Sequence, residues 1–143
     1  MNIPDEDHVM RHVSSKRLRR DEDGNPIGFL PAAFQLRVGE KGLSVNWIEY
    51  FKQAFEESIV SCIQHFRKNR GINKNSAFGV GNVGKIKNVC SKHGHKKVII
   101  VDDGHNKNKA HVLIRRMPED DLLLLDSLAS NVFSRCVPNK DVE

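Results

Sequence analysis

The side chains of this sequence best suited to acid–base chemistry are its seven histidines, two of which stand close together in the segment "DHVMRH". On a helix, His8 and His12 would share a face at the spacing of a metal-binding pair. In a strand they would lie about 13 Å apart, which is too far for both to bind one ion. Because Val9 and Val13 favour a strand, we expect neither a metal site nor another cofactor here.

Histidines on two different strands would suit another chemistry. Metal-independent ribonucleases use one histidine to remove the 2′-OH proton, a second to protonate the leaving oxygen, and a cation to stabilise the charged phosphorus centre. We therefore predict His12, His111 and Arg11 as catalytic residues. The alternation of a strand turns Arg11 and His12 to opposite faces, and only the fold can bring His111 beside either of them.

The segment "GVGNVGK" offers a phosphate-binding pattern. Gly79, Gly81 and Gly84 match GxGxxG, and Asp102 closes a later strand near the spacing of a ribose-binding acid. The segment before the first glycine is too polar for the buried strand of a dinucleotide-binding fold, and too little chain follows to complete its parallel sheet. The pattern fits better the start of a helix near residue 82, whose free N–H groups attract an anion.

Four residues are accordingly predicted to contact phosphate. Gly81 and Asn82 lie at the expected start of this helix, and Lys85 lies in its first turn. Arg115 lies on the expected strand that also carries His111. A P-loop is excluded, because Ile86 occupies the position of its Ser or Thr.

An arginine on an early strand followed by "LSVNW" resembles ADP-ribosyltransferase-like toxins. In that family an early Arg or His holds NAD, a serine-bearing strand lines the nicotinamide pocket, and a later glutamate orients the ribose. Arg11 and Ser44 match the first two features by position. The sequence departs from the family at the glutamate, because the candidates fall on expected helices rather than on a later strand: Glu49, Glu56, Glu57 and Glu119.

Composition and charge narrow the range of partners. The 143 residues include 23 Lys and Arg against 18 Asp and Glu, for a net charge of +5, with 38% hydrophobic and 29% charged residues. A basic globular chain favours anionic partners, so we expect RNA or a nucleotide, or else a protein partner. One Trp, one Tyr and seven Phe, mostly in expected core positions, do not indicate a stacking platform for single strands.

The cysteines and the hydropathy pattern suggest a location. Cys62, Cys90 and Cys136 are widely spaced, which predicts free thiols rather than a disulfide framework or a zinc finger. The first residues are polar, and no apolar run approaches the roughly 18 residues of a membrane span. We therefore expect a cytoplasmic protein that does not bind membranes.

Hydrophobic periodicity predicts the elements that must position these side chains. Period-two alternation and turn signals predict strands at 7–13, 77–80, 96–102 and 110–117, and a hairpin over 29–47. Apolar residues three and four apart predict a long helix over 47–69 capped by Asn46, a short helix near 82–92, and a final helix that opens at Pro118 and buries Leu122. Residues 14–28 are predicted as a solvent-exposed loop and 137–143 as a frayed tail.

These elements predict a single domain over residues 1–143 of the α+β class. Its mixed or largely antiparallel sheet is packed by one long central helix, one short helix and a C-terminal helix. The main functional hypothesis is a protein that acts on or binds a phosphate-bearing partner, as a metal-independent RNA- or nucleotide-processing enzyme. A non-catalytic interaction module and an ADP-ribosyltransferase-like domain remain the alternatives.

Overall fold

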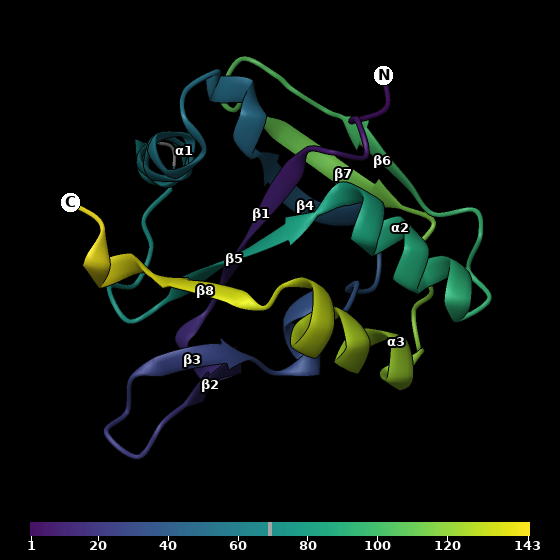
Figure 1. Ribbon diagram of the computed structural model, residues 1–143, viewed down its shortest axis with the longest axis horizontal. Coiled ribbons are helices and arrows are strands. Elements are labelled where there is room, and N and C mark those ends of the chain that lie inside the picture. The colour runs from purple at the N-terminus through teal and green to yellow at the C-terminus, as the bar shows by residue number, and fades with distance from the viewer. Residues whose placement is uncertain (69) are drawn as a thin grey trace.

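Six antiparallel strands form the main sheet of the computed structural model, which describes residues 1–68 and 70–143. Their order across the sheet is β6-β7-β4-β1-β5-β8 (Figure 1). Their bounds are β1 His8–Val13, β4 Gly42–Trp47, β5 Ala77–Asn82, β6 Ile99–Asp102, β7 His111–Arg115 and β8 Arg135–Pro138. Neighbouring strands pair antiparallel, so the predicted α+β class with a largely antiparallel sheet is confirmed.

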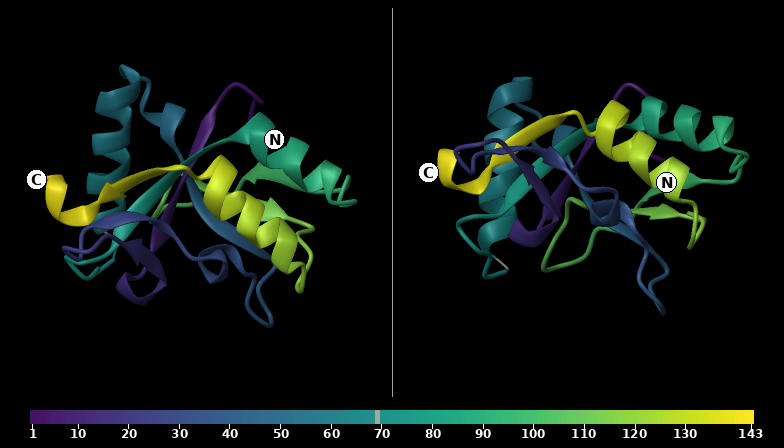
Figure 2. Two further views of the ribbon diagram at one scale, coloured as in Figure 1. Left: turned by 60° about the horizontal axis from the view of Figure 1, so that its bottom comes forward. Right: turned by 90° about the horizontal axis from the view of Figure 1, so that it is seen from below.

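Helices cover both faces of this sheet. α1 (Phe55–Lys68) packs on one face, while α2 (Val83–Lys92) and α3 (Leu122–Ser127) lie side by side on the other (Figure 2). On β1, Val9 belongs to the hydrophobic cluster of α2 and α3, whereas Met10 belongs to that of α1, as strand alternation requires. None of the helices in the described part of the chain has the length and apolar character needed to cross a membrane.

Most predicted elements in the second half of the chain are confirmed. The strands predicted near 77–80, 96–102 and 110–117 correspond to β5, β6 and β7. The short helix predicted near 82–92 is α2, and Gly94 follows it with a φ of 86°, a left-handed conformation that glycine adopts without steric cost.

The long helix predicted over 47–69 is wrong at its N-terminal end. Trp47 is the last residue of β4, Ile48–Phe51 form a separate 3₁₀ helix, and α1 begins only after it. Lys52 ends that short helix with a left-handed φ of 53°, and the predicted cap Asn46 is a buried strand residue. The apolar periodicity continues across the break because both helical segments bury side chains in one hydrophobic cluster.

The segment predicted as a solvent-exposed loop, residues 14–28, is exposed over most of its length, but the prediction that it lacks strands is wrong. β2 (Leu18–Arg20) pairs antiparallel with β3 (Pro26–Phe29) as a second, two-stranded sheet. Leu18 pairs with Phe29, and both side chains are buried in the main core. Core burial at the ends of the segment therefore orders a stretch whose composition is typical of a loop.

The hairpin predicted over 29–47 does not form. Residues Pro31–Phe34 make a 3₁₀ helix, and β4 pairs with β1 and β7 rather than with the segment before it. Alternation on β4 is still as predicted, because Leu43 and Val45 share the buried face. A turn does form at Val38 and Gly39, but the strands that pair with β4 come from distant segments.

The final helix begins later than predicted. α3 starts at Leu122 rather than at Pro118, because the Asp121 carboxylate caps it by accepting a hydrogen bond from the N–H of Leu124 at 3.1 Å. The prediction that Leu122 is buried is wrong, since the residue is 67% exposed. The helix then continues as a π-helical segment, Leu128–Val132.

The residues predicted as a frayed tail, 137–143, are tied to α1. The Arg67 guanidinium donates to Oδ1 of Asn139 and to the main-chain carbonyls of Asn139, Val142 and Glu143. Residues 137 and 138 also lie in β8, which pairs with β5. The sequence pattern could not reveal this, because the contacts join residues 72 to 76 positions apart.

The two middle strands of the sheet separate along part of their length. β1 pairs with β4 only at Val9↔Trp47 and Met10↔Asn46, although it pairs with β5 from His8 to Val13. β4 meanwhile pairs with β7 over residues 42–46. An opening therefore forms in the sheet beyond Met10, and the candidate site lies there.

Candidate functional site

A cavity of about 620 Å³ lies at the opening between β1 and β4, and we call it the cleft. The end of β1 and the polar face of β4 and β7 line it, together with segments around 33–40, 70–76 and 105–108. Three predicted catalytic residues line it together: Arg11, His12 and His111. The fold thus brings to one cavity side chains that the sequence could only propose separately.

The lining of the cleft is strongly basic. Of the residues that the structure describes, the cations lining it are Arg11, Arg17, Arg37, Arg70 and Lys107, and the histidines are His12, His105 and His111. The one carboxylate among the described lining residues is Glu40, and its Oε1 accepts a 2.7 Å hydrogen bond from the N–H of Arg37. An anion entering the cleft is therefore attracted from several sides.

Arg11 bridges the opening. Its Nε–H donates to the carbonyl of Ala33 at 3.0 Å, and its Nη1 donates to the carbonyl of Ser44 at 2.9 Å. The side chain thus takes the place of main-chain bonds that β1 no longer makes with β4. Burial lowers the pKa of Arg11 to about 10; Glu40 opposes the shift, and neighbouring arginines add to it. The guanidinium is therefore cationic at neutral pH and fixed at the edge of the cleft.

His111 forms a hydrogen-bonded chain with Asp103 and Ser44. Its Nδ1 lies 2.9 Å from Oδ2 of Asp103, and its Nε2 lies 3.1 Å from Oγ of Ser44. Because a carboxylate can only accept, Nδ1 carries a proton and donates a hydrogen bond to Asp103; in the form of the ring that carries no second proton, Nε2 accepts from the Ser44 hydroxyl. A hydroxyl, a histidine and an orienting carboxylate in this order are the arrangement that activates a nucleophile.

The loop before β7 holds this arrangement in place. The N–H of Asp103 donates to the carbonyl of His111 at 2.9 Å, and His105 and Asn108 exchange two main-chain hydrogen bonds of 3.1 and 3.0 Å. The His105 ring lies 5.6 Å from that of His111. A Cβ at Gly104 would meet the carbonyl oxygen of Lys109 at 2.5 Å, so the tight path of this loop requires glycine.

His12 has a different environment from His111. Its ring packs 5.1 Å from Phe66 of α1 and 5.2 Å from Phe78 of β5. Its Nε2 is buried and lacks a hydrogen-bond partner among the described residues. Burial and the positive charges of Arg70 and Arg11 lower the pKa of His12 to about 4, so at neutral pH the ring is a neutral wall of the cleft.

The glycine-rich segment lies outside the cleft, and its glycines serve packing. A Cβ at Gly79 would meet the Phe29 ring at 2.8 Å, and one at Gly81 would meet the Phe133 ring at 2.8 Å. A Cβ at Gly84 would meet the carbonyl of Asp5 at 3.1 Å. The spacing that resembles GxGxxG thus reflects close contacts of β5 and α2 with their neighbours.

The first turn of α2 already has hydrogen-bond partners. The N–H groups of Val83 and Gly84 donate to the carbonyls of Asp7 and Asp5, each at 2.9 Å. The N–H of Lys85 donates to Oδ1 of Asn82 at 2.9 Å, so Asn82 caps the helix. The donors expected to bind phosphate are therefore used by the N-terminal segment of the same chain.

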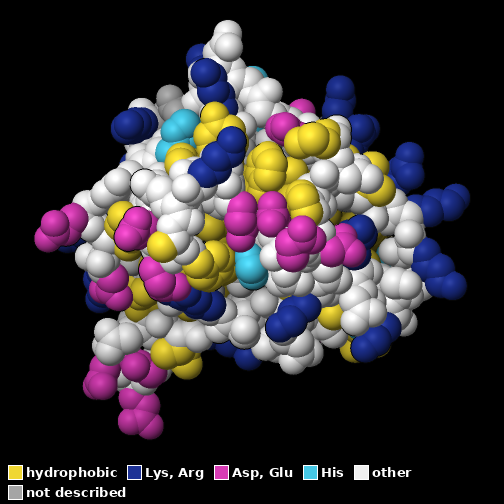
Figure 3. Space-filling view, turned by 45° about the horizontal axis from the view of Figure 1, so that its top comes forward, with side chains coloured by type: hydrophobic (Ala, Val, Ile, Leu, Met, Phe, Trp, Pro, Cys, Tyr) yellow, Lys and Arg dark blue, Asp and Glu magenta, His cyan; other side chains and the backbone are white. Residues whose placement is uncertain are grey.

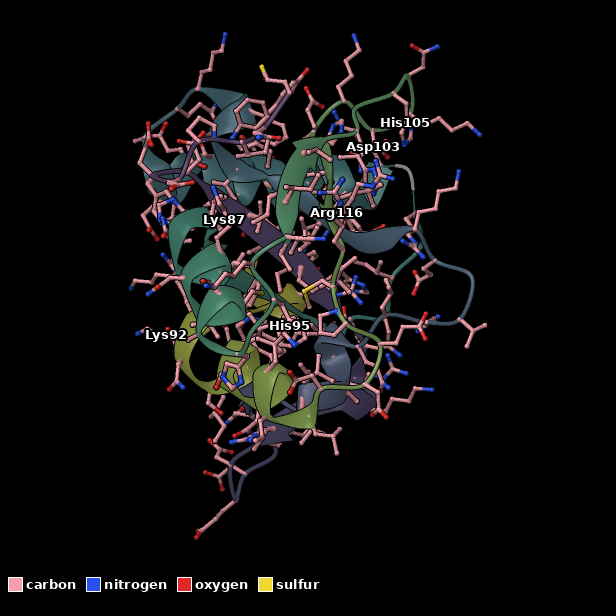
Figure 4. All side chains as sticks on the ribbon, turned by 90° about the vertical axis from the view of Figure 1, so that its right-hand side faces the viewer. Lys87, Lys92, His95, Asp103, His105 and Arg116 are labelled. Carbon is pink, nitrogen blue, oxygen red and sulfur yellow. The ribbon has the colours of Figure 1, made fainter. Side chains whose placement is uncertain are left out.

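The remaining predicted phosphate contacts are exposed and do not line the cleft. Neither Lys85 nor Arg115 lines the cleft, and both side chains are exposed. For α2, Figure 4 shows this separation: Lys87 and Lys92 lie well away from Asp103 and His105. The structure thus does not bring Gly81, Asn82, Lys85 and Arg115 together with the predicted catalytic residues.

The features shared with ADP-ribosyltransferase-like toxins meet only in part. Arg11 and Ser44 are joined by the hydrogen bond of 2.9 Å. Glu49 binds His8 through Oε2 at 2.7 Å, and Glu56 binds Arg135, both outside the cleft. None of the four predicted glutamates is among the described lining residues.

Cysteine and metal chemistry find no support in the described residues. Burial raises the pKa values of Cys90 and Cys136 to about 11, and burial raises the pKa of Cys62 as well. A thiol with a raised pKa is a poor nucleophile at neutral pH. Within residues 1–68 and 70–143, no three His, Cys, Asp or Glu side chains gather as a metal site would require.

The sequence did not predict Asp103 or Ser44 as catalytic residues. Asp103 lies in a turn-rich loop without a motif, and Ser44 was named only because of the resemblance to ADP-ribosyltransferase-like toxins. A weak signal existed on β4, where Ser44 and Asn46 alternate with buried Leu43 and Val45. Alternation predicts a polar strand face, but it does not say what faces it.

No protein-family model matches this chain, and neither curated proteins nor solved structures give a significant match.

Proposed function

We propose that this protein binds a nucleotide or the phosphate backbone of RNA in the cleft and cleaves a phosphoester there, with His111 transferring protons. The observation that carries the proposal is the convergence of basic side chains and His111 on one cavity that contains a single described carboxylate, Glu40. A cytoplasmic location, where such ligands are abundant, agrees with the three free cysteines.

Local charge supports the proposal more than the net charge does. The face drawn in Figure 3 carries a group of acidic side chains near its middle, with Lys and Arg mainly around its edges. Basic character is therefore not uniform over the molecule. Arginines from several segments of the chain line the cleft, and they suit the oxygens of a phosphate, which accept several hydrogen bonds at once.

His111 is better placed than His12 for proton transfer. Its side chain is 17% exposed, Asp103 orients it, and its Nε2 faces Ser44 within the cleft lining. The Nε2 of His12 is buried against the aromatic rings of α1 and β5. In the proposed reaction His111 therefore transfers the protons, whereas His12 contributes to the shape of the cleft.

The proposed binding can be tested with a fluorescein-labelled single-stranded RNA, whose fluorescence polarisation is measured at about 50 to 200 mM salt. Affinity should fall steeply with salt. Arg70→Ala should weaken binding several-fold and lower the salt slope by about 0.7 for each lost phosphate contact. Arg115→Ala removes the same charge outside the cleft and is the matched control. Absence of binding by the unaltered protein at low salt, to RNA and to nucleotides alike, would refute the proposal.

Analysis of the reaction products tests whether the protein cleaves a phosphoester, and it distinguishes this activity from a non-catalytic module and from a transferase-like enzyme. Cleavage of the RNA or release of phosphate from a nucleotide is expected. Tight binding without turnover would indicate a non-catalytic module instead. Release of nicotinamide from NAD would favour transferase-like chemistry, for which the contact between Arg11 and Ser44 is the specific observation.

A further inference from the structure

We propose that Ser44 is a catalytic nucleophile that forms a covalent phosphoseryl intermediate, with His111 as its general base and Asp103 as a positioning residue. This inference deepens the proposed function and rests on it for the class of substrate. It differs from a ribonuclease mechanism in one testable respect: the attacking oxygen comes from the protein rather than from the 2′-OH of the substrate.

Ser44, His111 and Asp103 are joined by consecutive hydrogen bonds. Ser44 Oγ lies 3.1 Å from His111 Nε2, and His111 Nδ1 lies 2.9 Å from Asp103 Oδ2. Both distances are within the reach expected of a nucleophile, its base and the group that orients the base. The three side chains come from β4, β7 and the loop before β7, so rigid strands hold the two reacting groups.

Two of these hydrogen-bonded side chains lie at the cleft, beside the cations that would bind a phosphate. Ser44 and His111 both line the cavity that holds the basic side chains. The Arg11 guanidinium is fixed beside the nucleophile, because its Nη1 donates to the main-chain carbonyl of Ser44. A cation next to the attacked phosphorus stabilises the charge that develops on its oxygens.

Water is the only co-reactant that the proposed reaction needs. The Ser44 oxygen attacks phosphorus, its proton passes to Nε2 of His111, and the bond from phosphorus to the leaving oxygen breaks. His111 gives the proton to that leaving oxygen. Water then attacks the phosphoseryl group, His111 takes the water proton, and the bond from phosphorus to Ser44 breaks as the serine oxygen regains a proton from His111.

A fluorophosphonate, which phosphonylates activated serines with loss of fluoride, is the direct probe. Incubation of the full chain should give one adduct by intact-mass spectrometry, and peptide analysis should place it on Ser44. Ser44→Ala should abolish labelling. His111→Ala should slow it by at least about 100-fold, as loss of a general base does. Ser130→Ala, at an exposed serine that does not line the cleft, should label at the unaltered rate.

Asp103→Asn tests the positioning role and avoids a folding defect, because the Asp103 side chain is 48% exposed. The variant keeps Ser44 and His111 but presents an amide that can satisfy either tautomer of the ring. Labelling and turnover should slow at least tenfold and the pH profile of the labelling rate should change, while the affinity for RNA stays unaltered. A purely structural carboxylate would leave the pH profile unchanged.

The outcomes separate this inference from the proposed function. An adduct absent from Ser44, or formed equally fast in His111→Ala, would overturn the nucleophile. Undiminished phosphoester cleavage by Ser44→Ala would also overturn it while leaving the proposed function standing. Labelling of Ser44 in a protein that binds neither RNA nor nucleotides would support the nucleophile and move the substrate to another anionic ester.

Discussion

Two regions of the molecule are candidate phosphate sites, and they differ in whether their polar groups are already hydrogen-bonded within the chain. At the start of α2, the glycine-rich segment has the more suggestive sequence, but its N–H groups donate to the carbonyls of Asp5 and Asp7 and to the cap Asn82. At the opening between β1 and β4, no motif exists, yet cations and histidines face a cavity. There, among the described residues, His12 Nε2 and Asn108 Oδ1 are buried without a partner.

The difference shows what a ligand site requires. A helix start attracts an anion only when its donors are unused, and the N-terminal segment uses those of α2. When the polar groups of a cavity lack hydrogen-bond partners within the chain, a ligand that supplies these partners is bound more favourably. Four predictions test this contrast, beginning with the largest expected effect.

The strongest test removes His111 from the cleft. His111→Ala should lower phosphoester turnover by at least about 100-fold, because proton transfer by a positioned side chain contributes about 10²- to 10⁴-fold. RNA affinity should change far less, since the cations remain. Comparison of kcat with the dissociation constant measures both effects. Equal losses in the two quantities would mean that His111 binds rather than transfers protons.

The second test is a packing change at the glycine-rich segment. Gly81→Ala should destabilise the protein by about 1–3 kcal/mol, as overpacking of a core does, because the added methyl group would meet the buried Phe133 ring at 2.8 Å. Denaturant unfolding measures this. Gly28→Ala, where nothing lies within 4 Å of the added carbon, is the matched control. A fully stable variant that loses ligand affinity would show that the segment binds phosphate after all.

The third test concerns the pH dependence of stability that His12 contributes. Its pKa is about 4 in the folded protein against 6.5 ordinarily, so between these values the unfolded chain binds the proton more readily. Stability from this residue is therefore complete above about pH 6.5 and is lost as the pH falls toward 4. Because the ring is partly exposed, we expect a loss of about 1–2 kcal/mol after solvent screening.

A variant isolates this contribution of His12 from other titrating groups. His12→Phe keeps an aromatic ring against Phe66 and Phe78, and its stability should fall less between pH 6.5 and pH 4 than that of the unaltered protein. Urea unfolding at several pH values measures the difference. Parallel pH curves for the two proteins would show that His12 titrates normally and is accessible to protons.

The smallest effect is expected at the start of α2. Lys85→Ala should leave RNA affinity within about twofold, the change expected from an exposed charge away from the bound ligand. Arg37→Ala, which removes an exposed cation that does line the cleft, should weaken binding more and reduce the salt slope. A reversal of these two results would move the phosphate site from the cleft to α2.

Local sequence patterns predicted much of the fold where the elements depend on near neighbours. The short helix predicted near 82–92 is α2, whose cap Asn82 accepts its hydrogen bond within the first turn of the helix itself. The alternation of β7 was likewise readable from the buried Val112 and Ile114. The prediction failed at residues 29–47 and 14–28, where strand partners and burial come from segments far along the chain.

The candidate site divides in the same way. The residue types of His111, His12 and Arg11 marked them as chemically capable, and strand alternation placed Arg11 and His12 on opposite faces. Those two still line one cavity, because β1 leaves β4 after Met10 and both faces of the strand border the gap. Ser44 and Asp103 could not be identified, because a hydroxyl or carboxylate acquires its role only from the histidine beside it.

The sequence by itself determined the α+β class, the basic charge, the free cysteines and most of the strand alternation, because these depend on composition and on periodicities of a few residues. Only the tertiary structure decided that the N–H donors of the glycine-rich segment are already hydrogen-bonded, and which residues line a cleft. The reason is that the hydrogen bonds of α2 to residues 5–7 and the contact of His111 with Ser44 join segments 67 to 79 positions apart. Such contacts follow from the strand order of the whole sheet, which no local pattern encodes.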